Sequence, residues 1–476
     1  MLICCFVNII DVLLDYCYLI VSLDLKKDYE FGWRWLLPLH AGITYRMYGF
    51  SVEEEQFWCT APLAFSSSSR NTLAEVLLVN PDNGYACNGP TDEEMGSASV
   101  ICIVAKRSSA RKWRSRLAAE FPLLKEYGLL PATNPRVIVP LAAPHLVVAA
   151  LGLHRPGRWV ARLGVSVAQS LAGIGNFSLL RGRVLLIASR DPKRPAHGSV
   201  VAGWPVRGGG ADEVEYALYL GGPDENRKTV IVPLGLNTPN VILKVAMLDK
   251  ARASLRNEAA SINALAHSPL AIHIPKLVDV VDADGILTLY QEYRPRRATK
   301  PRQMRESVIG FLASLSRMER RKERLAVLLE DIPVEASSGM SDKVAIACRA
   351  LYARLEALSQ AGTLLWVHRS HGDFASWNCS WSEHGIFVFD WEASRAQDLA
   401  FGDVFYYAIA PALHVQRNPH VQKTLDAALY LAQQVSESAD MGGVDCRVYL
   451  ALWLLGRLGE ASQYGELLIL LEEYWQ

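Results

Sequence analysis

The chain of 476 residues lacks the charge imbalance that marks many nucleic-acid-binding and membrane-surface proteins. Lys and Arg together number 49, as do Asp and Glu, so the formal net charge is zero. Global charge therefore gives no reason to expect a nucleic acid or an anionic membrane as partner. Hydrophobic residues make up 50% and charged residues 21%, a composition typical of folded proteins. The length predicts two or three domains.

The cysteines lack any spacing that would form a zinc site or a disulfide framework. There are nine of them, an odd number, with no CxxC pair and no Cys/His ligand pattern. This usage favours reduced thiols in a cytoplasmic protein. His368 and His371 lie three residues apart, but no second ligand pair accompanies them, so they do not predict a metal site.

The apolar N-terminus, residues 1–23, lacks the features of a secretory signal. No Lys or Arg precedes the apolar run and no small-residue cleavage site follows it. The segment is long enough to span a bilayer, but Asp11 and Asp15 oppose insertion. Asn8, Asp11 and Asp15 share one helical stripe, which favours a buried amphipathic helix. A membrane anchor is the alternative reading.

Residues 1–190 lack a GxGxxG sequence after a strand, so nothing there supports a dinucleotide or S-adenosylmethionine site. The pattern predicts a mixed α/β region whose function the sequence does not reveal. Its expected elements are strands at 99–106, 135–141 and 183–189 and helices at 110–128 and around 160–175.

A stretch rich in Pro, Gly and charge predicts a linker at 191–213. Residues 214–293 then show a β-β-β-α-β-β pattern: strands at 216–220, 229–235 and 240–248, a helix at 253–266 and a hairpin at 276–293. Residues 294–476 are mostly helical, with Ser341 expected to cap a long helix. We therefore expect a small antiparallel sheet lobe followed by a helical lobe.

Three polar side chains fall together in the helical part, in the stretches "HGDFASWN" (371–378) and "GIFVFDWE" (385–392). They are Asp373, Asn378 and Asp390, the last at the end of an apolar strand. Phosphoryl transfer from ATP needs a carboxylate to take the proton of the attacking hydroxyl and oxygen ligands to hold Mg²⁺. In the sheet lobe, Lys244 lies within an apolar strand and needs a partner, for which Glu258 on the next helix is suited.

The HGDxxxxN and DWE motifs at this spacing resemble those of the aminoglycoside phosphotransferase and choline kinase family, over roughly residues 205–460. The resemblance implies an α+β, protein-kinase-like bilobal domain that uses ATP and Mg²⁺. It implies that Asp373 is the catalytic base and that Asn378 and Asp390 are the Mg²⁺ ligands. "AFGDVFYY" (400–407) resembles the family's next segment, which makes Asp403 a structural residue.

The resemblance also implies the nucleotide contacts. Lys244 would bind the α- and β-phosphates, with Glu258 holding it, and backbone groups near Glu292 and Tyr293 would meet the adenine edge. His371 would pack the loop and would not act as a base. The expected nucleotide loop, "GGPDENRK" (221–228), departs from the family in being short and acidic. It could cover phosphate through its glycines or be a plain turn.

The segment "RPRRATKPRQMR" (294–305) carries six cations in twelve residues. This density of charge favours a solvated surface segment. The alternative is that the segment forms an entrance that attracts an anionic acceptor. The sequence thus predicts a cytoplasmic ATP- and Mg²⁺-dependent transferase that phosphorylates a hydroxyl of a small molecule. The alternatives are a nucleotide-binding regulatory or scaffolding pseudokinase module attached to an N-terminal domain and, from residues 1–23 alone, a membrane-associated assembly protein. Neither the acceptor nor the oligomeric state can be derived from the sequence.

Overall fold

The computed structural model describes most of the chain between Val76 and Trp475, together with two short strands before it. The expected apolar helix at 1–23 and the expected linker at 191–213 lie outside the described residues. Among the described residues, no helix is long and apolar enough to cross a membrane. The described ranges are 44–48, 66–67, 76–81, 90–130, 137–142, 144–153, 166, 169–170, 183–190, 215–221, 225–234, 241–283, 285–294, 301–330, 332, 340–382, 385–415, 420–458 and 463–475.

Contacts divide the chain into two compact units. Unit 1 consists of residues 1–253 and 278–291, and unit 2 consists of residues 254–277 and 292–476.

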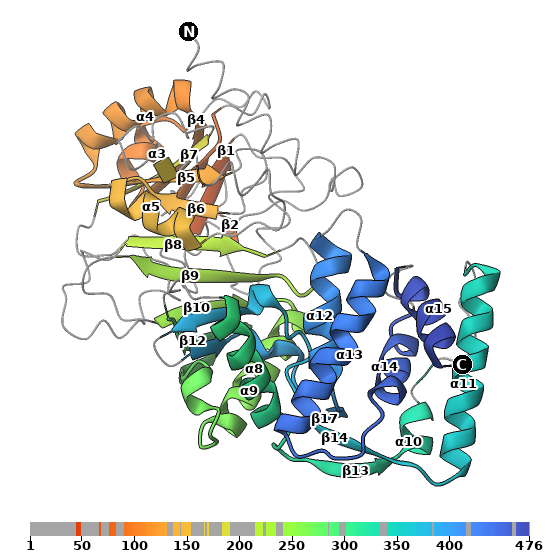
Figure 1. Cartoon of the computed structure of the whole chain (residues 1–476). Helices are drawn as coiled ribbons and strands as arrows, with labels where there is room; N and C mark the ends of the chain where they lie inside the picture. Colours follow the sequence, from red (N-terminus) through yellow and green to blue (C-terminus); the bar gives the residue numbers. More distant parts are fainter. Residues whose placement is uncertain are drawn as a thin grey trace. The chain divides into compact units, whose positions relative to one another are not determined.

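Unit 1 is built on one sheet of twelve strands, in the order β11-β12-β10-β9-β8-β6-β5-β7-β4-β3-β1-β2 (Figure 1). The strands are β1 Thr44–Tyr48, β2 Ser66–Ser67, β3 Val76–Val79, β4 Val100–Lys106, β5 Leu123–Leu130, β6 Val137–Pro140, β7 Arg183–Ser189, β8 Glu215–Leu220, β9 Lys228–Leu234, β10 Val241–Ala246, β11 Leu277–Ala283 and β12 Ile286–Glu292.

The N-terminal part of this sheet contains both parallel and antiparallel strand pairs. Strands β1, β2, β3 and β4 pair in parallel, whereas β5, β6 and β7 pair antiparallel. Helices α3 (Asp92–Ser97), α4 (Arg107–Glu120) and α5 (Pro144–Leu153) belong to the same region. The expected helix at 110–128 is too long: α4 ends at Glu120 and β5 begins at Leu123. Pro122 explains the stop, because a residue before proline is disfavoured in the helical conformation.

Strand β8 joins the N-terminal strands to those expected for a separate sheet lobe. It pairs antiparallel with β9 and, through Ile138 and Leu218, with β6. A largely buried ion pair between Lys125 Nζ and Glu215 Oε1, 3.2 Å apart, also links β5 to the start of β8. The described strands on either side of residues 191–213 therefore form one sheet.

The order of elements expected over 214–293 is the order observed. β8, β9 and β10 are followed by helix α8 (Asp249–Leu265) and by the hairpin strands β11 and β12. The helix forms because Leu255, Ala259, Ile262 and Leu265 make one apolar face, and all four are buried. The last twelve residues of α8 belong to unit 2.

Unit 2 is mainly helical, with the small sheets β13-β14-β17 and β15-β16. Ser341 caps α11, as expected, by accepting a hydrogen bond from Val344 N at 3.4 Å. The elements are η3 Ala271–His273, α9 Pro301–Leu315, β13 Arg321–Arg324, α10 Leu325–Glu330, α11 Asp342–Gln360, β14 Leu364–Ser370, η4 Ser376–Asn378, β15 Cys379–Ser382, β16 Gly385–Val388, η5 Trp391–Ala393, β17 Arg395–Leu399, α12 Gly402–Val415, α13 Val421–Ser438, α14 Cys446–Leu455 and α15 Gln463–Trp475.

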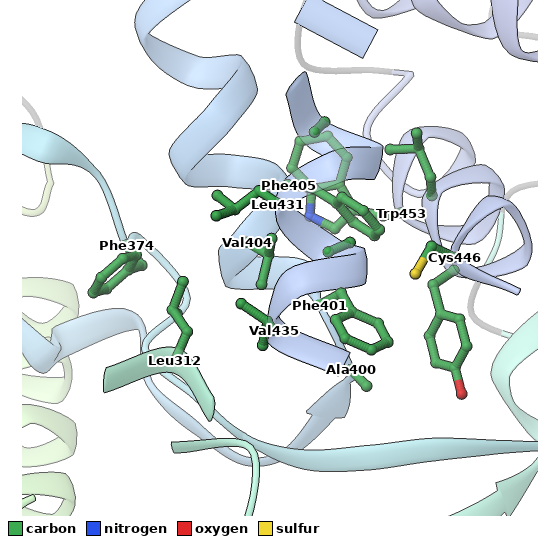
Figure 2. Close-up of a cluster of buried hydrophobic side chains, with 14 of the residues drawn as sticks. Leu312, Phe374, Ala400, Phe401, Val404, Phe405, Leu431, Val435, Cys446 and Trp453 are labelled. Atoms are coloured by element: carbon green, nitrogen blue, oxygen red, sulfur yellow. The ribbon is translucent and has the colours of Figure 1, made fainter. Parts of the chain in front are cut away.

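The core of unit 2 reaches the HGD loop through Phe374. Figure 2 shows Phe374 and Leu312 together at one side of the cluster and Phe405 and Trp453 at another. The ring of Phe374 is completely buried and stacks on Phe311 of α9, with centroids 5.5 Å apart. The residue that follows Asp373 is therefore fixed in the core, which limits the movement of Asp373 itself.

Candidate functional site

The buried carboxylate of Asp403 fixes the loop after β14. Asp403, in the first turn of α12, accepts hydrogen bonds from the backbone N–H groups of His371 at 2.6 Å and Gly372 at 2.9 Å. Burial raises the pKa of Asp403 to about 7, against the opposing effect of these two bonds. Asp403 thus has the structural contacts that the sequence resemblance implies.

Gly372 is required by the path of the loop. Its φ is +83°, and a Cβ atom built there would lie 2.2 Å from the carbonyl oxygen of Ala393. The HGD loop and the turn at Trp391–Ala393 therefore approach each other more closely than any side chain at position 372 would permit.

His371 is fully buried, and both of its ring nitrogens are hydrogen-bonded. Nδ1 accepts a hydrogen bond from Asp373 N at 3.3 Å, which places the proton on Nε2, and Nε2 donates to Phe389 O at 3.0 Å. The ring packs on Trp391 with centroids 4.6 Å apart. These contacts suit a residue that shapes the loop.

Asp373 and Asn378 are in direct contact. Nδ2 of Asn378 donates to the backbone oxygen of Asp373 at 2.9 Å and to its carboxylate Oδ2 at 2.8 Å. The side-chain oxygen of Asn378 makes neither bond and is the atom that a cation would take. The helix η4 brings the two residues together across five positions of sequence.

Two residues that the sequence did not single out also act on Asp373. The phenol of Tyr406, on α12, hydrogen-bonds to the carboxylate, and the positive charge of Arg457, just after α14, favours its ionised form. Burial raises the pKa of Asp373, and Asp390 raises it further. The bonds from Tyr406 and Asn378 and the charge of Arg457 oppose that rise. Only the "FYY" following Asp403 hinted at Tyr406; nothing in the sequence marks Arg457.

Asp390 lies beside two further carboxylates. Oxygen atoms of Glu258, Asp390 and Glu392 all lie within 4.8 Å of one another. Asp390 has φ 72° and ψ 58°, a left-handed conformation that residues other than glycine seldom adopt and that is often found at functional sites. Asn257 fixes α8 to this turn, because its Nδ2 donates to Glu392 O at 2.8 Å and to Ser394 O at 2.9 Å.

The donor set suits a hard divalent cation. It consists of the carboxylate oxygens of Glu258, Asp390 and Glu392. Asn378 O also accepts from Phe389 N at 3.1 Å, which ties the Asn378 segment to the strand that leads into Asp390. Glu392, the last residue of the DWE motif, was not among the expected ligands.

The other residues expected to bind the nucleotide are divided between the two units. Lys244 is buried in β10 of unit 1, opposite Val230 of β9, whereas Glu258 is completely buried in unit 2. Glu292 ends β12; its carboxylate binds Arg294 at 2.9 Å, and its N–H donates to Lys276 O at 2.9 Å. Tyr293 follows it directly. The structure thus brings Asp373, Asn378, Asp390 and Glu258 into one part of unit 2.

The loop between β8 and β9 is described at its ends. Gly221 N donates to Lys228 O at 2.9 Å, and a Cβ atom at Gly221 would lie 2.9 Å from that same oxygen. The acidic side chain of Glu225 pairs with Lys250 at 3.3 Å on the surface. Asp224 lies outside the described residues. In the basic segment 294–305, Arg294 stacks on Phe387 and Arg305 on Tyr430.

The strand order β8-β9-β10-β12-β11, the helix α8 and the mainly helical region that bears the HGD loop are the elements expected of a protein-kinase-like fold. Residues 232–410 match the model of the phosphotransferase enzyme family. The resemblance inferred from the HGDxxxxN and DWE motifs is thereby confirmed over those residues, and with it the α+β fold class.

Solved structures of several small-molecule kinases are similar to about half of the chain. An apo thermostable mutant of aminoglycoside phosphotransferase APH(4)-Ia is 14% identical, with 55% of this chain and 95% of that chain covered and a TM-score of 0.37. Amicoumacin kinase hAmiN in complex with AMP-PNP, Ca²⁺ and Ami is 13% identical, with 55% and 87% covered and a TM-score of 0.32. A putative fructosamine-3-kinase from Haemophilus somnus 129PT is 14% identical, with 52% and 86% covered and a TM-score of 0.30. No curated protein matches the chain.

Proposed function

We propose that the chain is an ATP- and Mg²⁺-dependent phosphotransferase that moves the γ-phosphate to a hydroxyl group of a small molecule. One observation carries the proposal: the carboxylate of Asp373 is fixed by Asn378 at 2.8 Å, and the backbone oxygen of Asn378 accepts a hydrogen bond from Phe389, the residue before Asp390, whose carboxylate clusters with those of Glu258 and Glu392. The family match over 232–410 supports the same reaction class.

In this reaction Asp373 is the base. Its carboxylate accepts the hydroxyl proton as the oxygen–phosphorus bond to the acceptor forms and the bond from the γ-phosphorus to the ADP oxygen breaks. A base of this kind must be ionised at working pH, and the bonds from Asn378 and Tyr406 favour the charged form against the effect of burial. The contacts of His371 keep the loop in the conformation that presents Asp373.

Asn378 and Asp390 would hold Mg²⁺, and the nearness of Glu392 to Asp390 adds it as a third candidate ligand. The cation would offset the charge of the phosphates during transfer. As the sequence resemblance implies, Lys244 would bind the α- and β-phosphates and Glu258 would hold it. Backbone groups at Glu292 and Tyr293 would bind the adenine edge.

A second candidate function is a regulatory or scaffolding module that binds nucleotide without transferring phosphate. The observation in its favour is the pairing of β6 with β8, which builds the first strand of the kinase-like domain into the sheet of the N-terminal region. A ligand of that region could act on β8 and β9 through the shared sheet.

The test is transfer of label from γ-labelled ATP to a metabolite extract, together with Mg²⁺-dependent ATP binding. Asp373→Asn should abolish labelling while ATP binding persists, because Asn cannot accept the proton; the expected loss is about 10²- to 10⁴-fold. Asp426→Asn is the matched control, since Asp426 is an exposed residue of α13 that bonds to Tyr474. ATP binding without transfer to any metabolite would favour the regulatory module, and failure to bind Mg·ATP would refute both proposals.

A further inference from the structure

The side chain of Gln291, near the end of β12, is buried with its amide oxygen unsatisfied. The residue is 1% exposed, and among the described residues no group donates a hydrogen bond to its Oε1. Burying an amide oxygen without a replacement for its hydrogen bonds to water is unfavourable, so such atoms are uncommon in folded proteins and call for an explanation. Oε1 of Gln291 is therefore suited to accept a hydrogen bond from a ligand.

Gln291 lies on the same face of the sheet as Lys244, and both belong to unit 1. β12 is the neighbour of β10, and Tyr290 of β12 packs in one cluster with Leu243 and Val245 of β10. Gln291 is the next residue after Tyr290, and Lys244 lies between the two β10 residues. Because side chains alternate between the faces along a strand, Gln291 and Lys244 both point to the face opposite that cluster.

This shared face is where the proposed nucleotide site would hold its ligand. Lys244 would bind the phosphates, and backbone groups at Glu292 and Tyr293 would bind the edge of the base. Gln291 directly precedes Glu292, so its side chain would lie at the base end of the ligand. At the 6-position adenine carries an amino group, a hydrogen-bond donor, whereas guanine carries an oxygen, which is an acceptor.

We propose that Gln291 selects adenine nucleotides, because its Oε1 accepts a hydrogen bond from the 6-amino group of the base. The proposal rests on the proposed phosphotransferase function, which supplies the nucleotide. Adenine would give the buried oxygen the donor that it needs. Guanine would place a second acceptor against Oε1 and leave both oxygens unpaired, which disfavours its binding.

Gln291 also has a purely structural explanation. Its amide would fill space in the core, with Oε1 bonded to an ordered water. That explanation predicts lower stability when Gln291 is replaced, and an affinity for nucleotide that does not depend on the 6-position of the base. The two explanations therefore separate in base preference.

The first experiment compares three nucleotides that differ at the 6-position of the base. ATP, GTP and purine riboside triphosphate, which has only hydrogen at that position, are titrated by calorimetry into the full-length protein with Mg²⁺. We expect ATP to bind about 10-fold more tightly than purine riboside triphosphate, the effect of one buried hydrogen bond, and GTP to bind most weakly. Equal binding of ATP and purine riboside triphosphate, or a preference for GTP, would overturn the proposal.

The second experiment removes the amide. In Gln291→Met, which keeps a side chain of similar length, the ratio of the Kd of purine riboside triphosphate to that of ATP should fall from about 10 to about 1, because only ATP loses a bond. Thr288→Val is the matched control, since Thr288 is buried in the same strand and three positions earlier, on the opposite face. It should keep the wild-type ratio. A wild-type ratio in Gln291→Met would refute the proposal.

These measurements separate failure of this inference from failure of the proposed function, because binding needs no acceptor. Binding of ATP without any effect of the 6-position would refute the role of Gln291 and leave the phosphotransferase proposal intact. Failure of all three nucleotides to bind would refute both. The urea midpoint of Gln291→Met should equal or exceed that of the wild type, since a buried unpaired acceptor is removed. A lower midpoint with an unchanged Kd ratio would favour the structural explanation and overturn the proposal.

Discussion

The two units of the chain use polar groups in different ways. In unit 1, successive residues such as Leu77 and Leu78 are both completely buried, because apolar side chains cover both faces of the sheet. Its described buried ion pair, Lys125 with Glu215, joins strands. In unit 2, polar side chains gather within reach of Asp373 and are fixed by a helical core. We therefore expect the sheet of unit 1 to govern stability and the HGD loop of unit 2 to govern chemistry.

Gly372→Ala should have the largest effect, because it should lower both phosphate transfer and the free energy of unfolding. The new Cβ would lie 2.2 Å from Ala393 O at a left-handed φ, so the loop and the following turn must separate. We expect phosphate transfer to fall more than about 100-fold and the free energy of unfolding to fall by about 2 kcal/mol. Transfer assays and urea unfolding measure both. Gly442→Ala is the control, since no atom lies within 4 Å of a Cβ there; equal behaviour of the two variants would contradict the geometry.

Glu215→Ala tests the sheet of unit 1. It would leave the ammonium of Lys125 largely buried without this carboxylate, at an expected cost of about 1–3 kcal/mol in the free energy of unfolding. Transfer activity at a temperature where the variant is folded should match the wild type. The double variant Lys125→Met with Glu215→Leu should recover most of the stability, and the midpoint of urea unfolding checks all three proteins. A loss of activity with no loss of stability would contradict the expectation that the sheet of unit 1 governs stability.

The pH dependence of phosphate transfer tests the role of Asp373, in unit 2, as the base. Asp373 has a raised pKa, chiefly through burial, so activity should fall on the acid side at a pH above the range of an ordinary aspartate. The positive charge of Arg457 lowers that pKa, so its removal favours the protonated, inactive form. The acid limb of the kcat/KM profile of Arg457→Met should therefore move to higher pH. Arg447→Met is the control, because Arg447 pairs with Asp445 at 2.8 Å. It should leave the limb in place, and a shift to lower pH in Arg457→Met would contradict the assignment.

Lys250→Ala should have the smallest effect. The pair that Lys250 makes with Glu225 is exposed at both ends, with side chains 61% and 81% accessible, and such pairs contribute less than about 1 kcal/mol. We expect an unfolding midpoint close to that of the wild type. The variant also tests whether the β8–β9 loop covers phosphate. If it does, the negative charge of Glu225, no longer balanced by Lys250, should raise KM for ATP slightly. If the loop is a plain turn, KM for ATP should not change.

The sequence predicted the parts of the molecule that depend on local pattern. β8 to β12 and α8 followed from alternation, helical periodicity and turn residues, and Asp373, Asn378 and Asp390 followed from motif spacing. The strand at 123–130 was missed because the apolar pattern of α4 continues past Pro122. Tyr406, Arg457 and the β6–β8 pairing could not be predicted, because each depends on contacts between segments far apart in the chain.

The pairing of β8 with β6 has a practical consequence for producing the protein. A fragment that begins at residue 214, where the sequence pattern places the start of a domain, would lose β6 and leave one side of β8 without its neighbour. An uncovered apolar strand such as "EYALYL" offers its backbone groups to strands of other molecules, a recognised cause of aggregation. Crystallisation and enzyme assays should therefore begin with the full chain, in which that side of β8 is already occupied.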